Sequence, residues 1–214
     1  MINQILIEAI RIAKLAGVSI RELRKKKDYE EYLKNSHELV TTADLLADAI
    51  IKSEISRQFP AHNVISEESQ RTDNWSLKKP TWIIDPIDGT VGYANNHYQV
   101  AVSIAFAIND SVEVGVVHNP FLGETFYAIR GSGAFLNGQQ IFAKKCTALN
   151  DSVIGTGFPH SKENINGIVE VLKSILPKVK DIRRLGSPAL DICWVASGSR
   201  SAERRVGKEC RSRW

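Results

Sequence analysis

Apolar residues recur at helical spacing over the first two dozen positions of the chain. They fall three or four residues apart, and the opposite face carries charged residues at Glu8, Arg11 and Lys14. A period near 3.6 residues predicts an amphipathic helix over residues 2–24. The charged stretch that follows, residues 24–31, is expected to be solvated and mobile.

Capping residues mark the start of a second helix. Thr41 and Thr42 are both good N-caps, so the helix is expected to begin after one of them and to run to about Gln58, ahead of Pro60. The helical pattern returns in two later segments, 161–176 and 187–197.

Short apolar runs and alternating segments, bounded by Gly, Pro, Asn and Asp, separate these helices. They predict strands over 62–66, 81–85, 99–108, 111–118, 124–130 and 152–156. Asn109 and Asp110 predict a hairpin turn between two of them, and a glycine-punctuated segment closes near Phe142. Helices on both sides of extended segments indicate a layered α/β protein.

The composition is that of a globular domain, with 43% hydrophobic and 24% charged residues in a chain of 214. The net charge of +4 has a local origin. Residues 200–214 carry six basic and two acidic side chains, so residues 1–199 are electrically balanced. A balanced body argues against a nucleic acid or a membrane surface as partner.

The spacing of the cysteines and the residues at the N-terminus indicate in which cellular compartment the protein is found. Three widely spaced cysteines without a CxxC pair fit a reducing environment better than a disulfide framework or a zinc site. Charged residues interrupt the first apolar segment, so it does not read as a signal peptide. Apolar runs also stay well below the ~18–20 residues that span a bilayer. We therefore expect a soluble, cytoplasmic protein with no membrane partner.

Two carboxylates and a hydroxyl cluster at the end of one apolar strand. Asp85 ends the strand, Pro86 is expected to stop the ladder, and Asp88 lies on the turn ahead of Gly89 and Thr90. Clustered oxygens suit a hard divalent cation, which also relieves the repulsion between close carboxylates. The pattern D-x-x-D-G-T is ordinary turn chemistry as well, so this segment alone fits either interpretation.

Two further acidic segments stand where an expected element begins or ends. Glu67 and Glu68 follow the strand over 62–66, and Asp44 stands near the start of the second helix. Each has a structural explanation, as solvated loop acids and as an acid favoured at a helix N-terminus. Three such clusters in a body without net charge favour a site for more than one metal ion.

The segments LVTTAD, SEES and WIIDPIDGT, in this order and spacing, resemble the motifs of the inositol monophosphatase family of magnesium-dependent, lithium-sensitive phosphatases. The later stretches GTGFP and GSPALDICWVASG are similar to family segments too. The resemblance covers residues 5–199. It implies a layered α-β-α-β-α sandwich of the sugar-phosphatase type.

The resemblance also implies a ligand set. Glu67, Asp85 and the carbonyl of Ile87 would hold one Mg²⁺, and Asp85 with Asp88 would help to hold a second.

Catalytic and substrate roles follow from the same resemblance. Asp44 and Thr90 would orient and deprotonate the attacking water, and Glu67 completes the catalytic set through its metal ion. The residues expected to contact the substrate are Asp88, Gly89, Thr90, Gly186 and Ser187.

The implied reaction is direct hydrolysis of a small phosphorylated polyol or sugar, foremost myo-inositol 1-phosphate, to the alcohol and phosphate. The resemblance further implies a homodimer. Two alternatives remain open. One is a broader phosphatase acting on fructose bisphosphate, NADP or nucleotide phosphates. The other is a weakly active or inactive chain that serves as a binding or regulatory protein, as some bacterial relatives do with the transcription machinery.

The chain departs from the family pattern in two places. After Thr90 the usual Thr-Asn-Phe is replaced, and Gly92 predicts a softer loop over 91–97. Residues 200–214 contain no Trp-Asp motif, whose aspartate completes the second metal site in the family. We therefore expect a truncated family domain over 1–199, with an incomplete second sheet, and a basic tail that is not native.

Two consequences of this ending are expected. Apolar surface around Ile192, Cys193 and Val195 should be uncovered, which favours poor solubility. A native basic tail that binds RNA or an acidic partner is the less favoured alternative.

Overall fold

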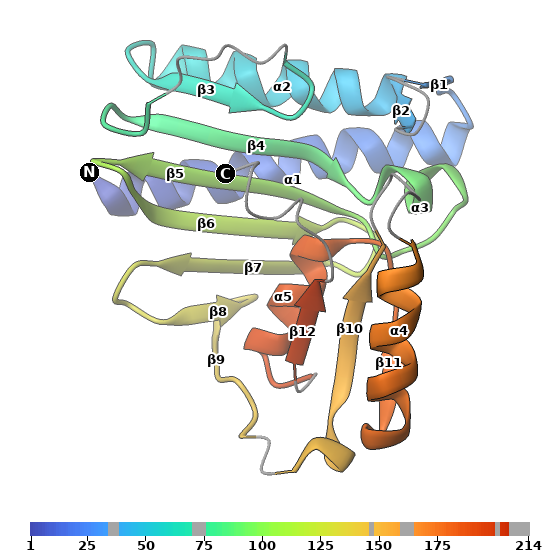
Figure 1. Ribbon diagram of the computed structural model, residues 1–214. Helices are drawn as coiled ribbons and strands as arrows, with labels where there is room; N and C mark the ends of the chain where they lie inside the picture. The colour runs from blue at the N-terminus through green and yellow to red at the C-terminus, as the bar shows by residue number, and fades with distance from the viewer. Residues whose placement is uncertain (34–38, 70–75, 146–147, 159–164, 200–201, 206–214) are drawn as a thin grey trace.

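Two sheets of unequal size organise the computed structural model, which describes residues 1–33, 39–69, 76–145, 148–158, 165–199 and 202–205, the last four by their backbone only. The larger sheet has seven strands in the order β3-β4-β5-β6-β7-β8-β9 (Figure 1). The first pair is parallel, and every later pair is antiparallel. Its strands are β3 (Asn63–Ser66), β4 (Thr81–Asp88), β5 (Ala101–Ile108), β6 (Ser111–Asn119), β7 (Glu124–Ile129), β8 (Ala134–Leu136) and β9 (Gln139–Ile141).

The smaller sheet has three described strands in the order β11-β10-β12, all parallel. They are β10 (Val153–Gly157), β11 (Asp181–Arg183) and β12 (Ala202–Arg205). A separate ribbon joins β1 (Glu31–Leu33) to β2 (Leu39–Thr41).

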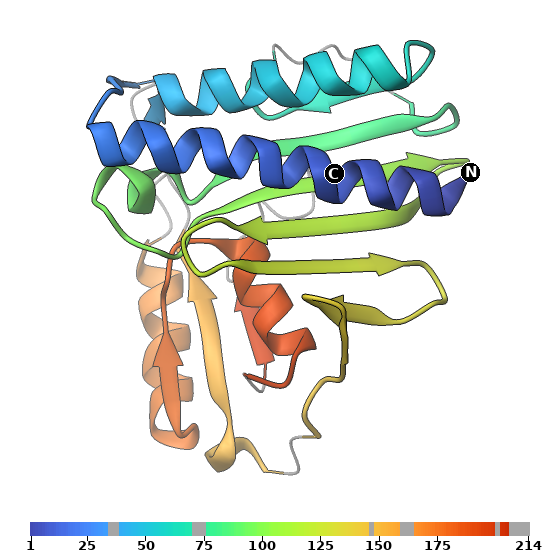
Figure 2. The same ribbon diagram turned by 180° about the vertical axis from the view of Figure 1, so that it is seen from behind.

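The helices form layers against these sheets. Figure 2 shows α1 (Ile2–Lys26) and α2 (Thr42–Gln58) side by side over one face of the larger sheet. The opposite face packs against α5 (Pro188–Ala196), and α4 (Ile165–Ile175) lies across the smaller sheet from α5. The short elements are α3 (Thr90–Ala94) and two 3₁₀ turns, Leu149–Asp151 and Leu176–Lys178. The order of layers is α-β-α-β-α, as the sequence predicts.

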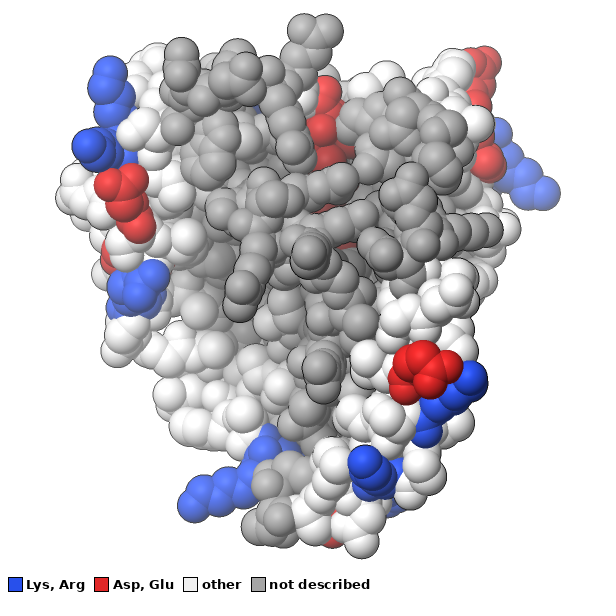
Figure 3. All heavy atoms as spheres, viewed as in Figure 1, with Lys and Arg blue, Asp and Glu red and all other residues white. Residues whose placement is uncertain are grey.

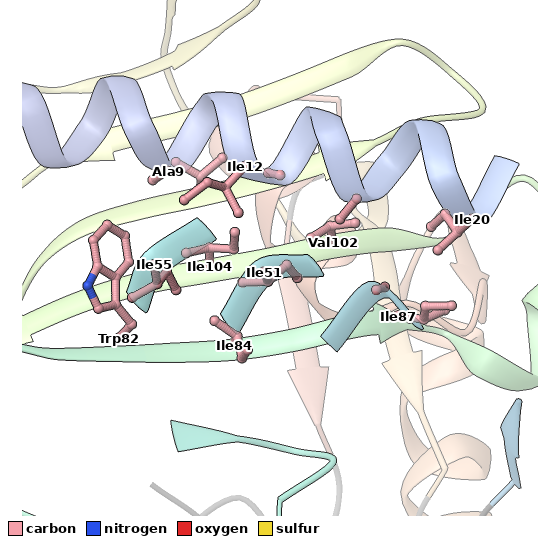
Figure 4. Close-up of a cluster of buried hydrophobic side chains, with 14 of the residues drawn as sticks. Ala9, Ile12, Ile20, Ile51, Ile55, Trp82, Ile84, Ile87, Val102 and Ile104 are labelled. Carbon is pink, nitrogen blue, oxygen red and sulfur yellow. The ribbon is translucent and has the colours of Figure 1, made fainter. Parts of the chain in front are cut away.

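The main core lies between the two N-terminal helices and the larger sheet. The periodic apolar face of α1 and the inner face of α2 meet alternate residues of β4 and β5, and nearly all of these side chains are buried. Figure 4 shows the cluster, which includes Ala9, Ile12, Ile20, Ile51, Ile55, Trp82, Ile84, Ile87, Val102 and Ile104. Burial of this shared face explains why two helices and a sheet form one rigid layer pair.

Most predicted elements are confirmed within two residues at their ends. The exceptions are the strand expected over 81–85, which continues to Asp88, and the helix expected over 161–176. The described part of that helix is Ile165–Ile175, because residues 161–164 lie outside the described ranges. The pattern missed the ribbon β1–β2 and the strand β11, which are only three residues long and carry no sustained alternation.

The expectation that Pro86 stops the ladder is wrong. β4 continues through Pro86 to Asp88, with a register shift between Asp85 and Asp88. Proline is tolerated there because the extra residue of a β-bulge needs no ladder hydrogen bond.

The expectation that residues 24–31 are all solvated is wrong at its first residue. Arg24 lies in the last turns of α1 and is only 8% exposed. Aromatic side chains surround its guanidinium, which is a tertiary arrangement that charge patterning does not reveal.

The predicted tail over 200–214 is described only at β12, which pairs in parallel with β10. A boundary after residue 199 stays a prediction. Within the described ranges, no helix has the length and apolar character needed to cross a membrane.

Candidate active site

A bulge in β4 brings Asp85 and Asp88 to the same face of the sheet. Trp82 and Ile84 alternate toward the helices, and with strict alternation residues 85 and 88 would face opposite ways. Between Asp85 and Asp88, three steps along β4 match only two along β5. The extra residue restores Ile87 to the helix-facing core and leaves both aspartates on the other face.

Asp85 lies among other carboxylates. Its Oδ1 atom is buried and has no hydrogen-bond partner among the described residues. Burial raises the pKa of Asp85 well above its ordinary value, and the nearby charges of Glu67 and Asp88, and more weakly Asp44, raise it further. An enclosed oxygen surrounded by like charges is the environment that a cation would neutralise.

Asp44 and Thr90 form a hydrogen-bonded pair across two elements. Asp44 is the third residue of α2, and its Oδ2 accepts bonds from the backbone N of Thr41 at 2.8 Å and from Thr41 Oγ1 at 2.6 Å. Its Oδ1 accepts a bond from Thr90 Oγ1 at 3.0 Å, and the same hydroxyl lies 3.1 Å from the carbonyl oxygen of Ile87. The capping role therefore occupies one oxygen of Asp44 and leaves the other for Thr90.

Burial sets the protonation of Asp44. Desolvation raises its pKa to about 6, against the lowering effect of the bonds from Thr41 and Thr90. A carboxylate with a pKa near neutrality can take up a proton at physiological pH.

Asp88 is held at the start of α5. Its Oδ2 accepts bonds from Ser187 Oγ at 2.5 Å and from the backbone N of Ala189 at 2.8 Å. Ser187 is fully buried and also caps α5 by accepting a weak bond from the N–H of Leu190 at 3.4 Å. The sequence predicted Asp88 and Ser187 at one site without predicting this bond.

Gly89 allows the two loops to approach. It has φ of +101°, and a Cβ placed on it would lie 3.0 Å from the carbonyl oxygen of Gln99 and 3.2 Å from that of Gly186. Only glycine fits a left-handed position with backbone this close. The two stretches expected to contact the substrate, one with Gly89 and the other with Gly186 and Ser187, are therefore in contact.

Glu67 lies on the loop after β3, where its side chain is exposed. The loop is fastened to α2 by Ser66, whose Oγ donates to Asp48 Oδ1 at 2.5 Å. Lys52 Nζ binds Asp48 Oδ2 at 2.5 Å and Ser69 Oγ at 2.8 Å. Sequence reasoning missed this support. The i,i+4 spacing of Asp48 and Lys52 was visible, but their pairing with the loop was not.

The residues present fit a divalent cation by their chemistry. They offer carboxylate and carbonyl oxygens, and the Asp85 oxygen lacks any other partner within the described residues. Across the described ranges, however, no three His, Cys, Asp or Glu side chains already stand in an arrangement that could hold a metal. Asp44 and Asp88 are engaged by protein donors instead, so a metal centre would need side chains to turn.

The structure thus brings together every residue that the sequence nominated. The charges of Glu67, Asp88 and Asp44 all raise the pKa of Asp85. Thr90 Oγ1 lies 3.1 Å from the Ile87 carbonyl oxygen, and Gly89 packs on Gly186 and Ser187. They come from four separate stretches of the chain and meet where β4, α3 and α5 come together, as Figure 1 shows.

Comparisons with known proteins agree with this geometry. The profile of the inositol monophosphatase family matches residues 1–211. Inositol monophosphatase 1 of Solanum lycopersicum is 36% identical over 194 residues, which cover 89% of this chain and 71% of that protein. Nus factor SuhB of Escherichia coli (strain K12) is 35% identical over 192 residues, covering 89% of this chain and 72% of that protein.

A crystal structure of the extragenic suppressor protein suhB from Bartonella henselae has the same fold. It aligns with a TM-score of 0.89 at 31% identity, over 95% of this chain and 79% of that one. With the profile match over nearly the whole length, these likenesses establish the relationship. The chain belongs to the inositol monophosphatase family.

Proposed function

We propose that the chain hydrolyses a phosphomonoester with water, in a reaction that depends on Mg²⁺. The observation that carries this proposal is Asp85 Oδ1, which is buried, lacks a partner in the described part of the chain and lies near the charges of Glu67, Asp88 and Asp44. Membership of a phosphatase family supports it.

The ligands proposed for the metal ions are Glu67, Asp85, the Ile87 carbonyl and Asp88. Divalent ions held by these residues would lower the pKa of a water molecule and would neutralise negative charge on the phosphate and the leaving group. Asp85 Oδ1 has no hydrogen-bond partner among the described residues, and the side chain of Glu67 already lies within hydrogen-bond reach of the Asp85 carboxyl group. The Ile87 carbonyl oxygen lies 3.1 Å from Thr90 Oγ1, and because the single proton of that hydroxyl goes to Asp44, the carbonyl keeps a lone pair for a cation.

Asp44 and Thr90 are the proposed activators of the attacking water. Thr90 Oγ1 donates to Asp44 Oδ1, so its lone pairs point away from Asp44 and can accept a proton from water. Asp44 Oδ1 then receives the hydroxyl proton of Thr90. Its raised pKa, about 6, suits this transfer near neutral pH.

The proposed substrate is a small phosphorylated polyol or sugar, with myo-inositol 1-phosphate first. Gly89 and Thr90 would face the phosphate, and Gly186 and Ser187 would line the alcohol side, because Gly89 packs directly on them. On the face shown in Figure 3, the described Lys and Arg side chains are spread around the rim rather than gathered in one basic patch.

A regulatory role is the second candidate, and the name of the Escherichia coli relative, Nus factor SuhB, favours it. A chain with this role would keep the fold and bind partners without needing turnover. Phosphate release separates the two functions.

The experiment measures phosphate release from myo-inositol 1-phosphate, fructose bisphosphate, NADP and 2′-AMP, with Mg²⁺, with a chelator and with added Li⁺. We expect Mg²⁺-dependent release that Li⁺ inhibits, highest kcat/KM on the inositol phosphate, and a loss of about 100-fold in kcat for Thr90→Ala that Thr90→Ser largely restores. Equal rates for Thr90→Ala and the unaltered chain would refute the assignment of the water-activating pair. No release on any substrate would favour the regulatory role.

A further inference from the structure

The last turns of α1 lie beside the active-site helix α3, as both ribbon views show. Arg24 is buried there. Its guanidinium carbon lies 3.2 Å from the ring centre of Phe121, 5.3 Å from that of Tyr93 and 5.8 Å from that of Tyr98. Within the described residues Arg24 forms no ion pair, so aromatic faces and one carbonyl replace the carboxylate that usually accompanies a buried arginine.

Three bonds tie this part of the chain to α3 and the loop after it. Arg24 Nη1 donates to the carbonyl oxygen of His97 at 2.6 Å, and the hydroxyl of Tyr93 donates to the carbonyl oxygen of Ile20 at 2.7 Å. The hydroxyl of Tyr29 lies 3.3 Å from the carbonyl oxygen of Ala94. These contacts cover residues 93–97 from one side.

The position of Tyr93 fixes that of Thr90. Both belong to the single helical turn of α3, and the N–H of Tyr93 donates to the carbonyl oxygen of Gly89 at 2.9 Å. A shift of Tyr93 would therefore move the hydroxyl that donates to Asp44.

The residues that follow α1 also hold the start of α2. The backbone N of Thr42 donates to the carbonyl oxygen of Glu30 at 3.0 Å, and the N of Glu30 donates to Thr42 Oγ1 at 3.0 Å. Thr42 is two residues ahead of Asp44. The end of α1 and the residues after it are thus fastened to both halves of the Asp44–Thr90 pair.

We infer that Arg24 is a positioning residue for the reaction. By holding the carbonyl of His97 and the rings of Tyr93 and Phe121, it keeps Thr90 within hydrogen-bond distance of Asp44. This inference rests on the proposed function of that pair. The bond from Arg24 to His97 also ties the loop that contains Gly92 to α1, in addition to the bonds within the loop.

The test compares Arg24→Met, Arg24→Lys and the matched control Arg21→Met, which makes the same change at an exposed position one turn earlier. The first readout is hydrogen exchange in metal-free protein. The backbone amides of Tyr93, Asn95, Asn96 and His97 all donate within this loop, so their exchange reports its opening. We expect them to exchange about tenfold faster or more in Arg24→Met, with β5 and β6 unchanged.

The second readout is kinetic. We expect Arg24→Met to lower kcat by about 10- to 100-fold with little change in KM, because the pair is displaced while the substrate contacts remain. Arg24→Lys keeps a donor for His97 and should recover part of the loss, and Arg21→Met should match the unaltered chain.

The outcomes separate the two claims. Unchanged loop exchange in Arg24→Met, or faster exchange with an unchanged kcat, overturns the positioning role. Faster exchange also in β5 and β6 overturns it too, because the residue would then support the whole fold. If the unaltered chain releases no phosphate, the proposed function fails, while the exchange data still show whether Arg24 holds the loop.

Discussion

Asp85 and Asp44 both lie near other carboxylates, but their oxygens differ in the hydrogen bonds that they accept. Asp44 accepts three bonds from Thr41 and Thr90, whereas Asp85 keeps a buried oxygen without a partner among the described residues. A buried, unpaired charge costs free energy that the fold alone does not recover. This contrast supports the proposed roles of Asp44 in proton transfer and of Asp85 in cation binding.

Replacing Asp85 by Asn should stabilise the metal-free protein. The change removes the repulsion from Glu67 and Asp88, so the free energy of unfolding should rise by about 1 kcal/mol in chelator. Urea denaturation with and without Mg²⁺ measures this. Asp110→Asn, the same change in an exposed turn, is the control and should have no effect. Lower stability of Asp85→Asn in chelator would contradict the electrostatic account.

At the scale of elements, the site depends on how closely loops approach. Gly89 stands at φ of +101° against the carbonyls of Gln99 and Gly186, and this contact joins the end of β4 to the start of α5. Gly138, at φ of +87°, has no heavy atom of the described residues within 4 Å of a Cβ placed on it.

Gly89→Ala should therefore destabilise the protein more than Gly138→Ala. Both substitutions incur the strain of a left-handed residue, about 1–2 kcal/mol, and only the first adds a clash with backbone. We expect a difference of at least ~1 kcal/mol in the free energy of unfolding. Chemical denaturation of the two variants checks it, and equal losses would show that the loops can separate without cost.

The contact between α1 and β6 also has a measurable signature. Burial lowers the pKa of His118 to about 4, and a Cβ on Gly17 would lie 2.7 Å from its Cδ2 atom. The folded state thus binds the proton less readily than the unfolded state. Its contribution to stability is present above pH 6.5 and is lost as the pH falls toward 4.

Between pH 7 and 5.5, this histidine should cost the protein about 1 kcal/mol of stability. Unfolding free energies of the unaltered chain and His118→Asn, measured across this range, test the prediction. The variant should lack that part of the pH dependence, because all other titrating groups are shared. Parallel curves would mean that His118 does not titrate as its burial requires.

The sequence predicted the helices and strands better than the bulge in β4 and the contacts between elements. Helical and alternating patterns located α1, α2 and β3 to β7, because each buries one periodic face. The bulge at Pro86 had a local signal in the sequence, which is a proline within an apolar run. Such a proline is typical either of the end of a strand or of a β-bulge. The burial of Arg24 had none, since its aromatic partners lie about 70 to 97 positions later in the chain.

The site residues were predicted from the resemblance to family motifs rather than from the pattern of hydrophobic and polar positions. Composition and spacing suggested clustered carboxylates, but the contacts of Asp88 with Ser187 and of Gly89 with Gly186 join segments about 100 residues apart. Such contacts follow from the packing of two sheets, which no local pattern encodes.

For the whole molecule, the exposed face of α5 matters most. Ile192 is 57% exposed, and Cys193 and Val195 are partly exposed, in line with the expectation of uncovered apolar surface. Whether this surface lowers solubility or pairs two copies stays a prediction.

Ile192→Asn should reduce self-association. Light scattering across a concentration series measures the average mass, and we expect it to fall toward that of one chain, 23.8 kDa, in the variant. Leu149→Asn, at an exposed leucine far from α5 in sequence, is the control. Identical scattering of Ile192→Asn and the unaltered chain would place any association elsewhere.

The most direct test of the proposed metal-dependent phosphatase site is phosphate release by Asp85→Asn beside Asp110→Asn, both in Mg²⁺. The account predicts a loss of at least ~100-fold in kcat for the first and an unaltered rate for the second, with both proteins folded. An Asp85→Asn protein that releases phosphate as fast as the unaltered chain would contradict it.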